Sequence, residues 1–399
     1  MRGCRLRVTL GHALKTQRKS AQPGREAESR KAESGAVPVR SDGIRIGVIG
    51  VGYWGSRHIR VLRSTTGVAD VVGIDPRFAR ISDDDHQVDH GIVAYADIEE
   101  ALPHVDAVVV ATPPATHAPL GLQAIAAGKH VLIEKPLAVT TEDARSLVEA
   151  AQAAGVVLMP GHTFEHNAAV HKLRDLVRRG ELGRLFYLDC ARLNLGLYQS
   201  DVNVILDLAP HDISIANFVL GSRPTIITAW GSRHVHPEYE DVAYLRLDYT
   251  DLHVRAHLHV SWLDPHKVRR ITAVGSKKMV VYDDMADGER IRLYDKSAVP
   301  PGDGDGPLSQ VAYHLGDVVS PYVAFAEPLA VQDQHFVDCI TSGAPPSVDG
   351  SSGLAVVQAL ECAQISLREQ RPVALAEVTQ RRTARQPAAD AALTGTPVG

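Results

Sequence analysis

Three glycines early in the chain have the spacing of a phosphate-binding loop. Gly50, Gly52 and Gly55 form a G-x-G-x-x-G pattern that directly follows a short apolar run and opens a helical stretch. In such a loop the first glycine permits a tight turn, the second lets the backbone approach a pyrophosphate, and the third allows close helix packing. The unpaired N–H groups of the helix start then favour an anion. The pattern predicts a dinucleotide site formed by Gly50, Gly52, Tyr53, Trp54 and Gly55.

An acidic residue follows at the distance expected in a dinucleotide-binding domain. Asp75 closes the second strand-like run of the chain, which is the first one after the glycines. A carboxylate at this position accepts hydrogen bonds from the adenosine ribose hydroxyls and repels a 2′-phosphate, so NAD is the expected cofactor. NADP stays open because the guanidinium of Arg77 could turn toward a 2′-phosphate, or it could simply be solvated.

Polar residues also follow the next two strand-like runs. Thr112, Pro113 and His117 come after one apolar run, and Glu134 and Lys135 close the other. Open parallel sheets bind their ligands at the carboxyl ends of their strands. These five residues are therefore expected to line the cofactor site.

A carboxylate and an imidazole stand four residues apart further along the chain. Asp207 and His211 fall within a predicted helix, so they share one of its faces. There the carboxylate can orient the imidazole and raise its basicity, which would make His211 a general base for a hydroxyl proton. Read without further context, Asp207 could equally be an N-terminal helix cap.

A regular alternation of strands and helices positions the first group of these residues. Strands are predicted at 44–50, 69–75, 105–111, 130–134 and 156–159, with helices at 54–63, 115–127 and 141–154. The strand-like runs are apolar without period-two alternation, as expected for parallel strands that are covered on both faces. We therefore predict an α/β fold with a Rossmann domain over residues 44–161.

The rhythm changes after about residue 162. Helices at 168–179 and 206–220 each end at a glycine, and consecutive strands follow at 225–235, 243–248, 252–260, 269–274 and 278–282. Successive strands without intervening helices predict an α+β domain on a mostly antiparallel sheet, over 162–378. Two late helices, around 332–341 and 353–369, could pack on either domain. Residues 1–43 and 379–399 show no periodicity and are expected to be disordered tails.

Composition excludes several classes of protein. The 399 residues carry a formal net charge of −5 without a sustained basic stripe, so nucleic acid is not expected as a partner. No apolar run approaches a membrane span of about 20 residues. The four cysteines, Cys4, Cys190, Cys339 and Cys362, form no C-x-x-C pair, which indicates neither a zinc site nor a disulfide framework. A cytoplasmic protein is therefore expected.

Three histidines alternate with apolar residues in a strand-like run. His253, His257 and His259 would share one strand face and could in principle hold a metal ion. Since no carboxylate or cysteine nearby completes a ligand set, we expect a polar or inter-subunit face and no metal.

The motifs together resemble the Gfo/Idh/MocA oxidoreductase family. The resemblance covers nearly the whole chain between the tails, and its most specific parts are the glycine loop, the stretch 111–117 and Glu134-Lys135-Pro136. It implies that Lys135 lies beside the nicotinamide and hydrogen-bonds the reacting hydroxyl, and that Asp207 and His211 join it in catalysis. It also implies a homodimer or homotetramer. Because these residues come from both domains, the active site is expected in the cleft between them.

The resemblance also suggests a substrate class. The residues around His162, Arg192, Asn194 and Asn203 look like the branch that acts on nucleotide-activated sugars, and these four are expected to bind substrate together with Lys135, Asp207 and His211. Any of the four could instead line a sheet edge or a loop. Two alternatives remain: an inositol or aminocyclitol dehydrogenase, and a catalytically silent regulator that senses NAD or a sugar.

Overall fold

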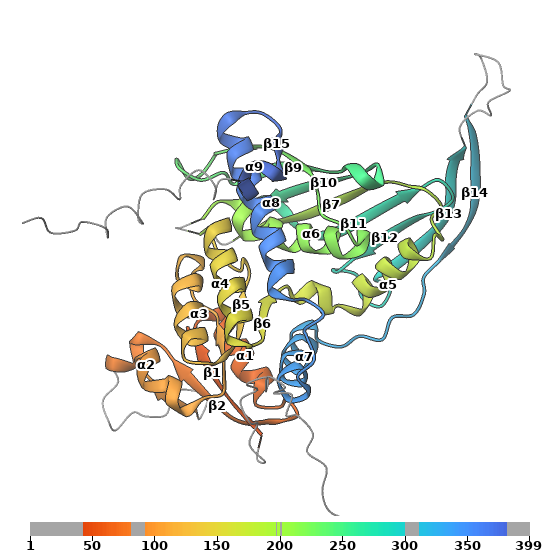
Figure 1. Ribbon diagram of the computed structural model, residues 1–399. Coiled ribbons are helices and arrows are strands. Elements are labelled where there is room, and N and C mark those ends of the chain that lie inside the picture. The colour runs from red at the N-terminus through yellow and green to blue at the C-terminus, as the bar shows by residue number, and fades with distance from the viewer. Residues whose placement is uncertain (1–42, 81–91, 197, 200–201, 300–310, 381–399) are drawn as a thin grey trace, which may run out of the picture. The chain divides into compact units, whose positions relative to one another are not determined.

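The computed structural model describes residues 43–80, 92–196, 198–199, 202–299 and 311–380. These residues form two β-sheets with their covering helices (Figure 1). The predicted tails lie outside these ranges except at their inner ends, Gly43 and residues 379–380. Helix α9 (Leu375–Gln380) includes residues 379–380, which were predicted to belong to the second tail.

The first sheet has six parallel strands in the order β3-β2-β1-β4-β5-β6. Their bounds are β1 Ile44–Ile49, β2 Val68–Ile74, β3 Val93–Tyr95, β4 Ala107–Val110, β5 His130–Glu134 and β6 Leu158–Gly161. This arrangement confirms the predicted Rossmann domain. Only β3 was missed, because three residues are too short for a recognisable pattern.

Helices cover both faces of this sheet. Helices α3 (His117–Ala126) and α4 (Thr141–Ala154) pack on one face, with the short α2 (Ile98–Ala101) near its edge. Helix α1 (Tyr53–Leu62) shares the other face with α7 (Pro328–Ser342), whose residues Phe336, Val337 and Ile340 join the same buried cluster as Ile59. Periodicity alone could not place α7, and the structure shows that it belongs to the nucleotide-binding sheet.

The second sheet has nine strands in the order β14-β13-β12-β11-β7-β10-β9-β8-β15. Among the pairings between these strands only β7 with β10 is parallel, which confirms the mostly antiparallel sheet. The bounds are β7 Leu185–Leu195, β8 Ile226–Ser232, β9 Val242–Tyr249, β10 Val254–Ser261, β11 Leu263–Gly275, β12 Met279–Asp283, β13 Ile291–Val299, β14 Ala312–Val319 and β15 Val373–Ala374.

Helices α5 (Ala168–Arg178), α6 (Val204–Leu220) and α8 (Gly350–Glu369) cover one face of the second sheet (Figure 1). Helix α6 ends as predicted at Gly221, whose φ of 64° is the left-handed conformation that glycine adopts without strain. Helix α8 also packs against α4 and β6, so it contacts elements of both sheets. The catalytic candidates on α6 are thereby held against the strand ends of the first sheet.

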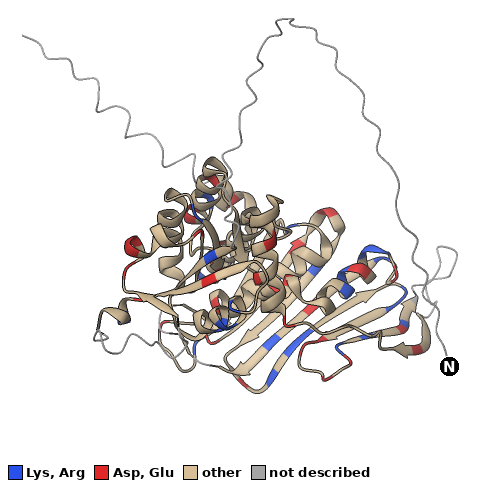
Figure 2. Cartoon of the chain, turned by 90° about the horizontal axis from the view of Figure 1, so that it is seen from below, with Lys and Arg blue, Asp and Glu red and all other residues tan. Residues whose placement is uncertain are grey.

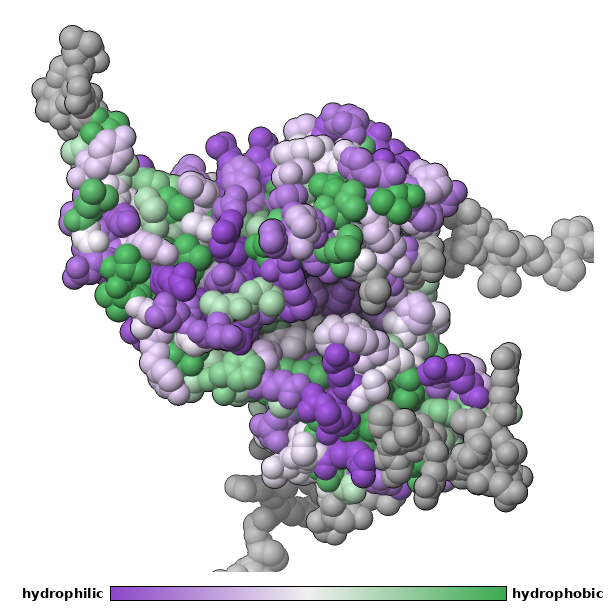
Figure 3. Space-filling view, turned by 180° about the vertical axis from the view of Figure 1, so that it is seen from behind, coloured by the Kyte–Doolittle hydropathy of each residue, from purple (hydrophilic) through white to green (hydrophobic). Residues whose placement is uncertain are grey.

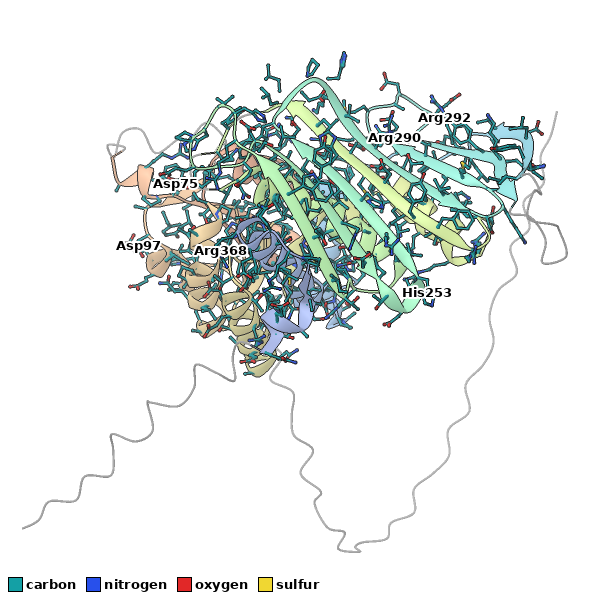
Figure 4. The ribbon with its side chains drawn as sticks, turned by 90° about the horizontal axis from the view of Figure 1, so that it is seen from above. Asp75, Asp97, His253, Arg290, Arg292 and Arg368 are labelled. Carbon is teal, nitrogen blue, oxygen red and sulfur yellow. The ribbon has the colours of Figure 1, made fainter. Side chains whose placement is uncertain are left out.

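Both signs of charge occur along the described part of the chain (Figure 2). Lys and Arg are interspersed with Asp and Glu along the strands and helices (Figure 2). His253 lies in the turn before β10 with a φ of 54°, and Figure 4 shows it at an end of the sheet. No group of three or more potential metal-ligating side chains occurs among the residues described, and no helix within them is long and apolar enough to span a bilayer.

Candidate active site

The glycine loop between β1 and α1 has the geometry that a pyrophosphate requires. Gly50 has a φ of 86°, and a Cβ at Gly55 would stand 1.9 Å from the carbonyl oxygen of Gly50. A Cβ at Gly52, in contrast, would meet no atom within 4 Å. The first and third glycines therefore serve the turn and the helix contact, whereas the second leaves open space beside the backbone.

The start of α1 is free to receive an anion. Its N-cap, Gly52, provides no side-chain cap, and its first turn holds no acidic residue, so the first N–H groups keep no side-chain acceptor. The side chains of Tyr53 and Trp54 are 66% and 40% exposed. The guanidinium of Arg57 covers the Tyr53 ring at 3.6 Å. Both the backbone and the exposed side chains of these two residues are therefore open to a ligand at the start of α1.

Asp75 follows β2 at the edge of this loop (Figure 4). Its Oδ2 accepts the N–H of Val51 at 3.0 Å, and its two oxygens accept Nε and Nη2 of Arg77, both at 2.9 Å. Burial alone would raise the pKa of Asp75, but the hydrogen bonds from Arg77 and Val51 outweigh it and lower that pKa. Arg77 thus occupies the oxygens that a ribose would need.

Arg77→Ala is expected to separate the two nicotinamide cofactors. Losing the guanidinium frees the Asp75 oxygens for ribose hydroxyls, so the Kd for NADH should fall about twofold or stay level. NADPH should bind about tenfold more weakly, since its 2′-phosphate loses the only cation next to Asp75 among the described side chains there. Fluorescence titration of both cofactors measures this, and an equal loss for NADH and NADPH would contradict the assignment.

The loop after β4 is tied to the loop after β5 by His117. Its Nδ1 lies 2.8 Å from the carbonyl oxygen of Pro136 and its Nε2 lies 2.8 Å from that of Thr112. The imidazole is buried at 1% exposure. In the described structure His117 positions the two loops, and its place in the cofactor site stays a prediction. Thr112 and Pro113 remain partly or fully exposed at the strand end.

Glu134 departs from the predicted role. The carboxylate is 5% exposed; its Oε1 lies 3.1 Å from Nε2 of His58, and its Oε2 accepts the backbone N–H of Lys135 at 3.1 Å. A carboxylate engaged in this way positions its neighbours instead of touching a cofactor. Sequence reasoning missed His58 and its second partner, Asp333, because they come from segments remote in the chain.

Lys135 connects the two sheets at the candidate active site. Its Nζ donates to the backbone oxygen of Asp207 at 2.9 Å and to Oδ1 of Asp207 at 3.1 Å. The other carboxylate oxygen, Oδ2, accepts Nε1–H of Trp262 at 3.0 Å. The ammonium from β5 and the first turn of α6 therefore meet, and the buried indole fixes the carboxylate between them.

His211 lies one turn further along α6 and is half-buried. Its ring packs edge-on against Phe164, and Nδ1 is buried with no hydrogen-bond partner among the described residues. Burial and the positive charges of Lys135 and Arg192 hold the pKa of His211 well below its ordinary value. Asp207 was expected to raise the basicity of this imidazole. It does not, because one of its carboxylate oxygens accepts from Lys135 and the other from Trp262.

The low pKa of His211 predicts an acid limb in the pH profile. The neutral imidazole accepts a proton, so kcat/KM for alcohol oxidation should stay level down to about pH 6.5 and fall only below it. Arg269→Gln removes a positive charge that lowers this pKa and should move the limb to higher pH. Arg290→Gln is the control, since Arg290 also bonds Asp284 but is not among the charges acting on His211. An unmoved limb in the Arg269 variant would refute the assignment.

The four predicted substrate residues fall into different settings. His162 is 1% exposed, and neither ring nitrogen has a hydrogen-bond partner among the described residues, although Nδ1 lies 3.3 Å from Glu165. Arg192 is buried in a two-bond pair with Asp212 at 2.9 Å. The pair engages Nε and Nη2 of the guanidinium and leaves Nη1 outside it.

Asn194 and Asn203 also differ from each other. Asn194 is half-buried near the end of β7. Asn203 caps α6 by accepting the N–H of Leu206, and its amide donates to Glu240 and Gln364. At 5% exposure this amide is engaged within the protein, so the structure shows Asn203 as a helix cap, and its substrate contact stays a prediction.

A dinucleotide loop beside a lysine, a carboxylate and a neutral imidazole defines a nicotinamide-dependent dehydrogenase. Comparison with family models identifies which one: residues 44–162 match the oxidoreductase family with an NAD-binding Rossmann fold, and residues 170–281 match the GFO/IDH/MocA C-terminal domain. The chain belongs to the Gfo/Idh/MocA family and is an NAD(P)-dependent dehydrogenase that acts on CH–OH groups.

Characterised relatives show the range of substrates in the family. UDP-N-acetylglucosamine 3-dehydrogenase from Acidithiobacillus ferrooxidans is 28% identical over 79% of this chain and 95% of its own length. Its crystal structure matches with a TM-score of 0.66 at 25% identity, over 82% of this chain and 98% of that chain. Myo-inositol 2-dehydrogenase from Thermotoga maritima is 28% identical over 84% and 99%. A 1,5-anhydro-D-fructose reductase from Ensifer adhaerens is 42% identical, but over 31% of this chain and 40% of its own.

Proposed function

We propose that this protein uses NAD to oxidise a secondary alcohol on a nucleotide-activated sugar, or to reduce the corresponding keto-sugar. The observation that carries the proposal is the meeting of Lys135 with Asp207 one helical turn from the neutral His211. A positive charge and a proton acceptor at one place are what an alcohol needs as it becomes a ketone.

The chain's own residues divide the work between them. The cofactor, when bound, supplies the hydride acceptor. The Lys135 ammonium, held by Asp207 in the free protein, would donate a hydrogen bond to the substrate oxygen and stabilise its developing negative charge. The His211 imidazole, whose Nδ1 has no hydrogen-bond partner among the described residues, would take the hydroxyl proton. The hydrogen bond from Trp262 would hold the Asp207 carboxylate in place when the lysine turns to the substrate.

The choice of substrate rests on the relatives and on the open polar groups. A UDP-sugar dehydrogenase matches almost its full length, and His162 and Asn194 keep polar atoms available near α6 and β7. An inositol dehydrogenase matches equally well, so a free inositol or aminocyclitol is the second candidate. The family contains both activities, and side chains that serve either one need only present hydrogen bonds to ring hydroxyls.

A substrate panel tests this proposal. UDP-N-acetylglucosamine, other UDP- and dTDP-sugars, myo-inositol and aminocyclitols are each mixed with NAD and with NADP, and the absorbance of the reduced nicotinamide is followed. Turnover of a nucleotide sugar is expected, with binding of free UDP or dTDP in ultrafiltration. Turnover of free cyclitols alone would select the second candidate. If the wild type binds NAD but turns over nothing, the chain would be a silent sensor, for which the lysine, aspartate and histidine together have no evident use.

We propose further that the protein acts as a homo-oligomer in a reducing compartment such as the cytoplasm. Cys190 and Cys339 are free thiols, which suits a reducing setting. On the uncovered face of the second sheet Tyr244 stacks between Trp230 and His259, and this aromatic row is partly exposed. The face of the molecule opposite to the view of Figure 1 carries apolar patches between polar ones (Figure 3). Sedimentation of the wild type and of Tyr244→Asp tests whether this face joins subunits.

A further inference from the structure

A buried chain of ionisable side chains runs from α7 to the catalytic lysine. Nδ1 of His58 lies 3.0 Å and 3.1 Å from the two carboxylate oxygens of Asp333, and Nε2 of His58 lies 3.1 Å from Oε1 of Glu134. His58 and Asp333 are 0% exposed, and Glu134 is 5% exposed. The chain joins three elements that are distant in sequence: α1, the end of β5, and α7.

The geometry favours a charged His58. An imidazole between two ionised carboxylates donates from both nitrogens and is an imidazolium. Burial raises the pKa of Asp333, and the positive charge and hydrogen bond of His58 oppose that rise. Burial alone would lower the pKa of His58, but Asp333 and Glu134 raise it to about 10. The imidazolium in turn lowers the pKa of Glu134 although burial opposes this. At neutral pH a full positive charge is therefore enclosed behind the strand end.

Glu134 links His58 to the backbone of Lys135. While Oε1 faces His58, Oε2 accepts the backbone N–H of Lys135 at 3.1 Å. A carboxylate held at both oxygens cannot rotate freely, so the peptide of Lys135 is fixed. Gly161 on β6 closes the other side, since a Cβ there would stand 3.0 Å from Cα of Glu134. The Lys135 side chain then reaches Asp207 from a rigid base.

We propose that His58 is a positioning residue for the catalytic lysine, with its charge held by Asp333 and its effect transmitted through Glu134. This inference rests on the proposed function in that it takes Lys135 as the group that contacts the reacting oxygen. It makes α7, which lies between β14 and β15 in the chain, part of the machinery that sets the active site. None of His58, Glu134 and Asp333 touches the substrate in this scheme.

A simple clamp between α1 and α7 is the competing explanation. Other contacts already hold these helices together: Phe336, Val337 and Ile340 pack in the cluster with Ile59, and Gln334 bonds the backbone of Thr66 in both directions. None of these contacts reaches Glu134. They provide a matched control, because Gln334→Ala removes both hydrogen bonds between α7 and Thr66, which follows α1, and leaves the buried chain intact.

The test combines Asp333→Asn, His58→Gln and the Gln334→Ala control. Asparagine keeps the shape and a hydrogen bond but removes the negative charge, so the pKa of His58 should fall and a neutral imidazole should appear between about pH 7 and 9 in ¹⁵N-histidine NMR spectra. In the same range kcat for the substrate found in the panel should fall about tenfold, with NADH affinity unchanged within threefold. The kcat of the wild type should show no corresponding fall below pH 9. His58→Gln should lose activity at all pH values.

A second measurement does not depend on turnover. Reductive methylation with formaldehyde, followed by peptide mass spectrometry, reports the access of reagent to Lys135, whose side chain is 11% exposed. His58→Gln should speed labelling of Lys135 about fivefold and leave labelling of Lys172 and Lys277 within twofold of wild type. Gln334→Ala should leave the labelling of all three lysines within twofold of wild type. If the wild type turns over no panel substrate, the proposed function fails, yet this labelling still decides the inference. Unchanged labelling in His58→Gln and Asp333→Asn would overturn it, as would equal effects in Gln334→Ala.

Discussion

Replacing Lys135 with alanine should lower kcat by about 10³-fold while the Kd for NADH changes less than threefold. The ammonium is the one described cation that lies within hydrogen-bonding distance of Asp207, and it would donate to the oxygen on which negative charge develops. Loss of a single such donor costs about 10² to 10³ in kcat, and loss of a full charge should cost at least as much. The lysine makes no described contact with the glycine loop, so cofactor affinity should survive.

Two further variants make the Lys135 result specific. Lys135→Arg keeps the charge but changes its shape and should recover only part of the activity. Lys129→Ala removes the bond from Nζ to the backbone oxygen of Val105, near the start of the same strand, and should leave kcat within threefold. Single-turnover kinetics with NAD and NADH fluorescence titration separate chemistry from binding. If Lys135→Ala retained more than a tenth of the wild-type kcat, another group would have to stabilise the charge.

The local parts of the fold could be predicted because each carries its own signal. The helix 141–154 was predicted with its observed bounds, since Thr140 accepts the N–H of Asp143 as an N-cap and Gly155, at a φ of 65°, ends the helix. The glycine loop and the parallel strands beside it are similarly encoded by spacing and composition. Strands β13 and β14 were missed, and every residue of β14 is exposed, so no alternation of polar and apolar residues marks it.

The partners of the site residues could not be predicted, because spacing shows which residues share a face but not what lies opposite. Asp207 and His211 do share α6, yet the Asp207 carboxylate accepts hydrogen bonds from Lys135, just after β5, and from the Trp262 indole. Asn203, not Asp207, caps the helix. Asp333 stands 275 residues from His58, and nothing in either local pattern links them. Buried polar contacts of this kind depend on the packing of α7, which periodicity left undecided.

Gly52→Ala and Gly55→Ala should fail in opposite ways, although both replace a glycine of one loop by the same residue. At Gly55 the new Cβ would stand 1.9 Å from the carbonyl oxygen of Gly50, so strand and helix must move apart. Such overpacking should cost about 2 to 3 kcal/mol of unfolding free energy and abolish NADH binding as a consequence. Thermal denaturation without cofactor measures the first effect directly.

At Gly52 the backbone has a φ of −92° and a ψ of −150°, and the new methyl group meets no protein atom within 4 Å. Gly52→Ala should therefore melt within about 2 °C of wild type. It should nevertheless bind NADH at least tenfold more weakly, because the methyl group would fill the space that a pyrophosphate needs beside the start of α1. A stable Gly52→Ala protein that binds NADH normally would mean that the phosphates lie elsewhere. The open space beside Gly52 would then not be the pyrophosphate site.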